Sequence, residues 1–493
     1  MVDSATIPCV HGFALALLLA ATDLPSQARL EAAVQEAIAG SCPQRTVTID
    51  PDLTTAARAF VAAARGGLTD LTGSALSFYG SLESSEPSPV AGVATVAPPS
   101  QADRAVGELF PKACRFNRIG VAAAVLPGGE AIVAALTAQH ASDLAAIPGT
   151  VAPGSSIEVS GRLSAGLARP RLFVTRPGGE VEELKLASAG DRFSGRIPLR
   201  PAGEHSVEVL ADGPGGPQVL ALRRIFVGVD RPARPPAPRA TGTGLAGVEA
   251  AIDGLRSARG LPHLQRDAEL DAVAEGHSRE MARTRTFAHV LATDGSLSDR
   301  LRKSGYAYRS AGENIGLSDD AVSAHEAVAG SPAHLANLLD PHHRRLGLGV
   351  ARGVSPDGAQ ALYLTEVLAA PVVGSADPAS EALGLIAQER VRRKLPPLER
   401  SADLDAVARR AITEVAMADS LTLRAGVTAD ALESDPSLKS VVGELFVGSA
   451  PDETKTSRNL ADPRWTHVGL GAIYASSKIY GPGRLWVLIL YAN

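Results

Sequence analysis

The residues of this chain whose types could do chemistry gather between positions 311 and 351. Glu313 lies inside a Gly-Glu-Asn triplet, and His334 ends the stretch Ser-Pro-Ala-His, after which a glycine-punctuated, strand-like segment follows. A carboxylate and an imidazole can exchange protons, hold a metal ion or form a hydrogen-bonded network. The stretch is therefore either a chemical site or the framework of a fold.

Two more histidines precede that stretch. The sequence "AELDAVAEGHSREMARTRTFAH" reads as a helix, and His277 shares one face of it with Leu270 and Met281. We therefore expect His277 to be a buried core histidine whose hydrogen bonds are satisfied. His289 comes after the helical pattern fades at Thr286, so it is freer to face a cleft.

Motifs of known hydrolytic enzymes are missing from the sequence. It contains neither a Gly-x-Ser-x-Gly elbow nor a His-Glu-x-x-His helix. Ser331 is the only nearby hydroxyl inside a motif, and we expect it to cap the helix that Pro332 begins. No cysteine follows position 114, which excludes thiol catalysis in the later part of the chain.

The elements that position these residues occur more than once along the chain. "LPHLQRDAELDAVA" (261–274) aligns with "LPPLERSADLDAVA" (395–408), and "TIDPDLTTAARAFVAA" (48–63) is a weaker echo. Each unit closes with a glycine-containing β segment, and the three segments read "RRLGLGVA", "THVGLGAI" and "NRIGVAAA". Matching beginnings and endings predict three copies of one α/β domain.

A different pattern separates the first two copies. Residues 148–229 alternate apolar and polar side chains between turn signals, which predicts an immunoglobulin-like β-sandwich followed by a stiff proline-rich linker. The predicted fold class is α+β multidomain. The predicted domains are a first α/β copy at 29–145, the sandwich at 148–230, the linker at 231–243, and further copies at 244–372 and 378–493.

Composition and charge limit the cellular compartments and the binding partners that we expect for this protein. The chain has 493 residues, 45% of them apolar, and a formal net charge of -5, which gives no electrostatic reason to expect nucleic acid. The apolar run 11–21 is too short to span a bilayer and fits a secretory signal within residues 1–28. If Cys9 leaves with that signal, Cys42 and Cys114 remain as a pair that can form a disulfide, with two buried thiols as the alternative.

The ordered motifs of the third domain resemble those of the CAP superfamily, which comprises the cysteine-rich secretory, antigen 5 and pathogenesis-related proteins. The resemblance is to its cysteine-poor bacterial branch, covers residues 244–370 and rests on Phe-x-His, Asp-Gly, Arg, Gly-Tyr, Gly-Glu-Asn-Ile, Ser-Pro-x-His and Leu-Gly-x-Gly-Val. It implies an α-β-α sandwich, secretion, and a central cleft lined by two histidines and acidic residues. On motif matching, the cleft residues are His289, Glu313 and His334.

The chain also departs from the family pattern. The family's second acid has no clear counterpart, and Glu326 and Glu366 are the candidates for it. His325 is an extra histidine, which we expect to be exposed on its helix. Three positions carry other residues than the family's Trp, Gly and Arg, namely Val328, Ala333 and Leu335.

The chemistry of the trio leaves alternatives open. Two imidazoles and a carboxylate can hold a divalent metal such as zinc with an open water position, or Glu313 can fix the tautomer of one imidazole in a metal-free network. The favoured function is non-catalytic binding of an extracellular or cell-surface lipid, glycan or protein by a secreted, periplasmic or envelope-associated protein. The alternatives are a metal-dependent hydrolase, with His289 and His334 as ligands and Glu313 as general base, and an architectural adhesion protein.

The flanking copies lack most of the trio. In the last copy Gly443 and Glu444 are aligned with Gly312 and Glu313, but no histidine matches His289 or His334. The first copy, at 29–145, has no histidine before His140. We expect these copies to keep the framework without the site.

Overall fold

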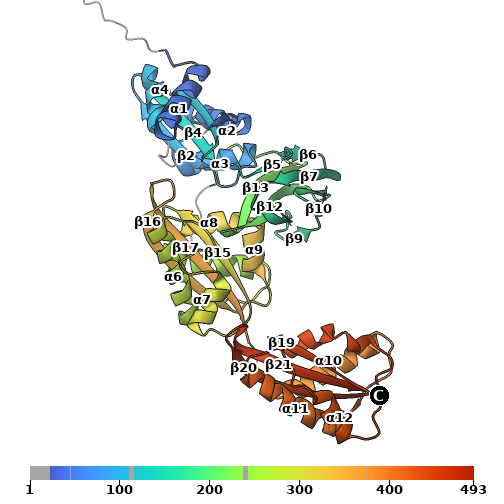
Figure 1. The fold of residues 1–493 in the computed structure, drawn as a ribbon. Coiled ribbons are helices and arrows are strands. Elements are labelled where there is room, and N and C mark those ends of the chain that lie inside the picture. Colours follow the sequence, from blue (N-terminus) through green and yellow to red (C-terminus); the bar gives the residue numbers. More distant parts are fainter. Residues whose placement is uncertain (1–22, 45, 110–115, 237–242, 373–374) are drawn as a thin grey trace, which may run out of the picture. The chain divides into compact units, whose positions relative to one another are not determined.

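The computed structural model describes residues 23–44, 46–109, 116–236, 243–372 and 375–493. These residues form a mixed α/β chain with five β-sheets (Figure 1). Contacts divide them into two compact units. The first comprises the described residues up to Gly161, Ile197–Glu204 and a segment that starts at Leu220, whereas the second comprises Arg162–Arg196, His205–Val219 and the described residues from 243 to Asn493.

The N-terminal α/β region carries helices on both faces of one sheet, whose strand order is β1-β3-β4-β2. Helices α2 and α3 cover one face through Phe60 and Leu76, and α1 and α4 cover the other through Val34 and Val106. The elements are α1 (Gln27–Ser41), β1 (Thr48–Ile49), α2 (Pro51–Arg65), α3 (Gly73–Glu83), β2 (Val90–Val96), η1 (Pro99–Gln101), α4 (Ala102–Glu108), β3 (Arg118–Val125) and β4 (Ala131–Ala138).

Two sheets without helices follow, with strand orders β10-β11-β7-β5 and β6-β13-β12-β8-β9. Their immunoglobulin-like assignment stays a prediction. The strands are β5 (Ser142–Leu144), β6 (Thr150–Val151), β7 (Ser155–Leu163), β8 (Ala168–Thr175), β9 (Val181–Leu184), β10 (Ala187–Ala189), β11 (Arg192–Leu199), β12 (Gly203–Gly213) and β13 (Gly216–Val227).

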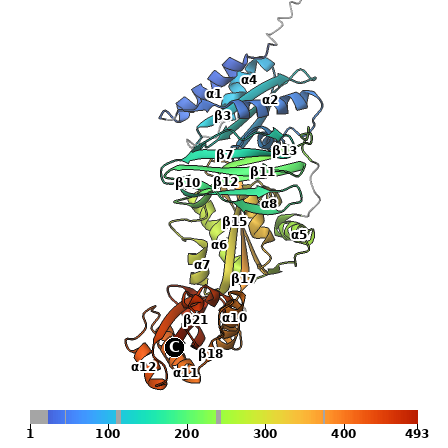
Figure 2. The ribbon, with the colours of Figure 1, turned by 90° about the vertical axis from the view of Figure 1, so that its right-hand side faces the viewer.

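The third region holds the Gly-Glu-Asn and Ser-Pro-Ala-His motifs. Its sheet has the order β14-β16-β17-β15, so β15 is an edge strand. Helix α6 packs on one face through Leu270, and α5, α8 and α9 pack on the other through Val248, Val328 and Leu338. Figure 2 shows α6 on one side of β15 and α5 and α8 on the other. The elements are α5 (Gly244–Ser257), β14 (Gln265–Arg266), α6 (Ala268–Thr284), α7 (Leu297–Ser304), β15 (Tyr308–Ser318), α8 (Ala321–Gly330), α9 (Pro332–Leu339), β16 (Arg345–Val354) and β17 (Gln360–Pro371).

The last region repeats this order of strands as β18-β20-β21-β19. Helix α11 packs on one face of the sheet through Leu404, and α10 packs on the other through Ile386. The elements are α10 (Pro378–Arg392), β18 (Glu399–Arg400), α11 (Ala402–Met417), α12 (Val427–Ser434), β19 (Val441–Gly448), η2 (Pro451–Thr456), η3 (Asn459–Ala461), β20 (His467–Ser477) and β21 (Gly481–Ala492).

The glycines of the Leu-Gly-x-Gly-Val motif belong to the framework. A Cβ on Gly347 would lie 2.3 Å from the carbonyl carbon of Leu270, and one on Gly349 would lie 2.1 Å from the backbone nitrogen of Glu275. Only hydrogen fits there, because the backbone of α6 rests directly on β16. This half of the opening stretch therefore positions the fold and carries no chemistry.

A buried arginine performs the same task in the last two regions. The guanidinium of Arg256 donates to the carbonyl oxygens of Pro262, Leu338, Asp340 and His343. That of Arg390 donates to four carbonyls at matching places, those of Pro396, Leu460, Asp462 and Trp465. Each arginine ties its helix to the loops that lead into the sheet.

Parts of the sequence predictions fall outside the described residues. The apolar run 11–21 of the predicted signal lies there, and so does Cys114. Cys42 is buried and disulfide-bonded, while its predicted pairing with Cys114 stays a prediction. Among the described residues, every helix is too short or too polar to cross a bilayer.

Candidate functional site

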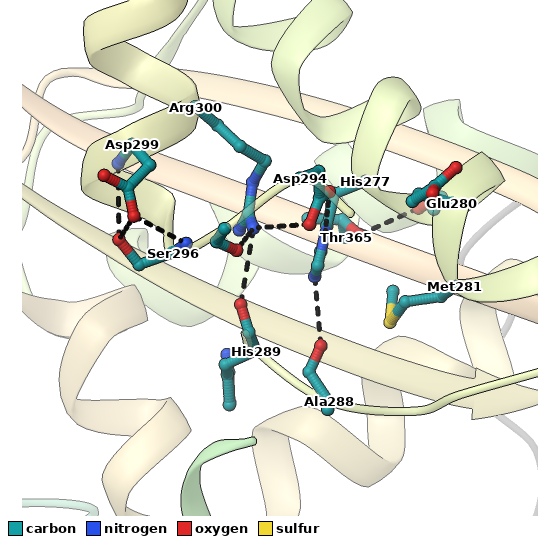
Figure 3. A network of polar contacts seen from close by, with 12 residues as sticks. His277, Glu280, Met281, Ala288, His289, Asp294, Ser296, Asp299, Arg300 and Thr365 are labelled. Carbon is teal, nitrogen blue, oxygen red and sulfur yellow. Dashed lines mark hydrogen bonds and ion pairs between the residues drawn. The ribbon is translucent and has the colours of Figure 1, made fainter. Parts of the chain in front are cut away.

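His277 of the third region is held inside the core. Helix α6 starts at the cap residue Asp267, whose side chain accepts from the backbone N–H groups of Glu269 and Leu270. His277 is fully buried, with Nδ1 2.7 Å from Oδ2 of Asp294 and Nε2 3.1 Å from the carbonyl oxygen of Ala288 (Figure 3). Both ring nitrogens have partners, as predicted for a core histidine.

Glu313 is the centre of the polar network. On β15 it pairs with Val367, and its side chain is only 4% exposed. Nδ1 of His289 lies 3.0 Å from Oε1 of Glu313, and the guanidinium of Arg300 donates to Oε2. Both carboxylate oxygens are therefore occupied by partners inside the protein.

Arg300 joins the loop after α6 to the sheet. One of its guanidinium nitrogens donates to the carbonyl oxygens of Gly295, at 2.8 Å, and His289, at 3.3 Å, and lies 3.6 Å from Oδ1 of Asp294 (Figure 3). The guanidinium thereby fixes the loop that carries His289. Helix α7 starts with a Ser296–Asp299 capping box and presents Arg300 in its first turn.

The charge of Glu313 is decided by competing effects. Burial by itself would raise the pKa of this carboxyl. The hydrogen bond with His289 and the positive charge of Arg300 outweigh burial, so the pKa of Glu313 lies below its usual value. Glu313 is therefore ionised at neutral pH, and His289 donates a hydrogen bond to it from Nδ1.

The second imidazole comes from the start of α9. The rings of His289 and His334 are stacked, with centroids 6.0 Å apart and planes inclined by 25°. Burial, and next the neighbouring His289, lower the pKa of His334 to about 3. His334 is therefore neutral at physiological pH and can donate from one ring nitrogen and accept at the other.

Ser331 does not make the predicted helix cap. Helix α9 begins at Pro332 as expected, but the Ser331 side chain makes no capping hydrogen bond. Its hydroxyl donates to Oε1 of Glu208 on β12 at 2.6 Å and also lies 2.6 Å from Nδ1 of His334. The other oxygen of Glu208 accepts from the backbone N–H of Ala333 at 2.7 Å, so a carboxylate from a distant strand caps the helix.

The structure brings His289, Glu313 and His334 together, through the contact of His289 with Glu313 and the stacking of the two imidazoles. The described residues contain no group of three histidine, cysteine or carboxylate side chains that could hold an ion. Glu313 has both oxygens engaged, by His289 and Arg300. The metal site predicted on these three residues, and the metal-free network that is its alternative, both stay predictions.

The secondary candidates lie elsewhere. His325 is buried rather than exposed as predicted, because Ala321, Ala324, His325 and Val328 form the buried stripe of α8. Its Nδ1 lies 2.7 Å from Oε1 of Glu366. Glu366 pairs with Asn314 across β15 and β17, so its side chain lies on the opposite sheet face from that of Glu313. Glu326 is exposed, and neither acid completes the trio.

Strand register corrects the predicted equivalence of Glu444 and Glu313. Gly347 and Gly469 occupy matching places on β16 and β20. Gly347 pairs with Val367 on β17, which pairs with Glu313 on β15. Gly469 pairs with Leu490 on β21, which pairs with Gly443 on β19. Glu444 is one residue further along and therefore faces the other side of its sheet. There it accepts from the backbone and side-chain N–H groups of Asn459.

The N-terminal region lacks the carboxylate as well. Gly120 on β3 matches Gly347 and pairs with Leu136 on β4, which pairs with Ala91 on β2. Ala91 therefore occupies the place of Glu313. Neither flanking sheet carries an acid at this position.

Comparison with known proteins identifies the region that holds this network. Residues 249–365 match the cysteine-rich secretory protein (CAP) family. Residues 249–365 are a CAP superfamily segment. A 95-residue part of the chain is 33% identical to the uncharacterized protein YkwD of Bacillus subtilis (strain 168), covering 19% of this chain and 37% of that protein.

Two solved structures are similar to the chain at lower identity. An extracellular protein containing an SCP domain from Bacillus anthracis str. Ames is 20% identical, with 38% of this chain and 66% of that chain covered and a TM-score of 0.23. An outer surface protein from Borrelia burgdorferi is also 20% identical, with 25% of this chain and 90% of that chain covered and a TM-score of 0.22.

Sequence reasoning missed three residues that hold the CAP segment's network. Arg300 and Asp294 stand inside the quoted motifs, Arg and Asp-Gly, so their presence was visible although their roles were not. Glu208 had no comparable signal. It lies in an alternating strand between the buried residues Val207 and Val209, where the pattern predicts an outward, solvated side chain.

Proposed function

We propose that the CAP segment is a non-catalytic binding module that meets its ligand with the imidazoles of His289 and His334. One observation carries the proposal. The two rings are stacked and only partly buried, while the charged groups behind them, Glu313 and Arg300, are paired with each other. A stacked pair of rings whose neighbouring charges are already paired inside the protein suits recognition.

The same contacts argue against a hydrolase. A general base must accept a proton from water or substrate, yet both oxygens of Glu313 are engaged by His289 and Arg300. Ser331 is the hydroxyl nearest to His334, but it lies in a chain with buried Glu208 and is itself only 5% exposed. We therefore propose binding of a lipid, glycan or protein ligand rather than its cleavage.

We further propose a secreted or envelope-associated protein in which the CAP segment is one of three α/β copies. The disulfide at Cys42 favours an oxidising compartment, and the apolar run 11–21 fits a secretory signal. The three sheets with one strand order support copies at 29–145, 244–372 and 378–493, with an immunoglobulin-like sandwich at 148–230 and a linker at 231–243. The flanking copies would extend the contact surface.

The test compares binding by the full chain and by three variants. Immobilised glycans and vesicles of phospholipid with and without sterol serve as probes for two of the proposed ligand classes. We expect His289→Gln and His334→Gln to weaken the binding of whichever probe is bound by at least tenfold. His263→Gln is the matched control, because this histidine is in the same region but is 63% exposed and outside the network.

The other outcomes separate the alternatives. Unchanged binding by both site variants would reject the proposed role of the rings and favour the architectural alternative. Turnover of a probe by the wild type that disappears in both variants would instead establish catalysis at this site.

A further inference from the structure

The side chain of Glu208 reaches the imidazole pair from the β12 sheet. Glu208 is fully buried, and its residue range His205–Val219 belongs to the same compact unit as the CAP segment. Its two oxygens accept from the Ser331 hydroxyl and from the Ala333 backbone N–H. In a second contact, the backbone N–H of Val290, next to His289, donates to the carbonyl oxygen of Gly215, which follows β12, at 3.0 Å.

The hydroxyl of Ser331 links this carboxyl to His334. Its oxygen lies 2.6 Å from Oε1 of Glu208 and 2.6 Å from Nδ1 of His334, but a hydroxyl carries only one proton. If that proton points to an ionised Glu208, Nδ1 of His334 must bring its own hydrogen to the serine oxygen. If Glu208 donates instead, the serine proton points to Nδ1.

The two arrangements place the ring hydrogen of His334 on different nitrogens. A neutral imidazole holds one ring hydrogen, so a hydrogen on Nδ1 leaves Nε2 with a lone pair, whereas an unprotonated Nδ1 requires a hydrogen on Nε2. We infer that Glu208 is a positioning residue that, through Ser331, sets whether His334 offers its ligand an acceptor or a donor at Nε2.

The ionised form of Glu208 has a consequence for ligand choice, which rests on the proposed function. His334 then carries its hydrogen on Nδ1 and presents a lone pair at Nε2. A ligand that donates hydrogen bonds, such as the hydroxyl groups of a glycan, matches this lone pair.

The test reads the tautomer of His334 directly and needs no ligand. The chain has 11 histidines, so ¹⁵N-histidine labelling gives few signals even at 50.7 kDa, and the His334 signal is assigned by its loss in His334→Gln. At pH 8.5 we expect wild-type His334 to carry its hydrogen on Nδ1. In Glu208→Gln the amide donates to Ser331 while its carbonyl accepts from Ala333, so the hydrogen should move to Nε2.

Two further variants keep the result interpretable. Glu183→Gln changes an exposed acid of the same sheet and should leave the tautomer as in the wild type. Ser331→Ala removes the link, so adding Glu208→Gln to it should no longer move the hydrogen. The same His334 tautomer in wild type and Glu208→Gln, with both folded by circular dichroism, would overturn the inference. A tautomer change without ligand binding would overturn only the proposed function.

Discussion

Glu208 should make the stability of the CAP segment depend on pH. Burial raises the pKa of this carboxyl from 4.5 to about 7, against the hydrogen bonds from Ser331 and Ala333 and the nearby charge of Arg171. A carboxyl whose pKa is raised by folding favours the folded state when protonated. The stabilisation of the folded state by protonated Glu208 is therefore fully present below pH 4.5 and is lost as pH rises to about 7.

The size of the effect follows from the shift. Each pH unit between the two pKa values costs about 1.4 kcal/mol, so the interval costs on the order of 3 kcal/mol. Glu208→Gln cannot ionise and should lack this loss. His334 has the opposite dependence, because its pKa is lowered to about 3 and its contribution is lost as pH falls below 6.5. The comparison must therefore be between wild type and variant at each pH.

Hydrogen exchange of the Ala333 amide measures the effect where it arises. This amide donates to Glu208, and its protection in the full chain reports the free energy of separating the two. After correction for intrinsic exchange rates, the protection ratio of wild type to Glu208→Gln should fall by roughly a hundredfold between pH 4.5 and pH 7.5. A constant ratio would refute the assigned pKa shift, and Glu183→Gln should show that constant ratio as the control.

Three more predictions concern the framework and the network. Arg300→Met leaves Glu313 buried without its cation. We therefore expect the hydrogen-exchange protection of β15 to fall by roughly 3 to 5 kcal/mol. Arg302→Met, at an exposed arginine of the same helix, is the control and should change this protection little. Arg390→Met strips four carbonyls of their donor and should destabilise the last region by on the order of 3 kcal/mol. Urea unfolding followed by tryptophan fluorescence measures it, because the chain's two tryptophans, Trp465 and Trp486, both lie in that region, and the exposed Arg392→Met is the control. Gly347→Ala should lower the protection of α6 by roughly 1 to 3 kcal/mol by overpacking against Leu270, while Gly276→Ala, with open space around its Cβ position, should raise it by up to about 1 kcal/mol. Equal effects of the two glycine substitutions would contradict the packing argument.

Local patterns in the sequence determined much of the CAP segment. The 3.6-residue period placed His277 on the buried side of α6, and the paired glycines of β16 marked the close approach of a helix. The burial of His325 was also readable, because Ala321, Ala324, His325 and Val328 follow the spacing of a helical stripe. These features depend on neighbours within one or two turns of chain, so the local order of residue types records them.

Tertiary structure alone decided the partners of the charged groups. Whether Glu444 matches Glu313 depends on strand register, and a slip of one residue moves a side chain to the other face of the sheet. That Arg300 pairs with Glu313 depends on how α7 lies against β15. The sequence pattern predicts that Glu208 is a solvated strand residue. In the structure the start of α9, more than a hundred positions away in the sequence, covers its side chain. The charge and hydrogen bonds of a side chain depend on the groups within a few ångströms of it. Folding brings these groups together from segments distant in the sequence, and the pattern of one segment does not indicate which other segment it will contact.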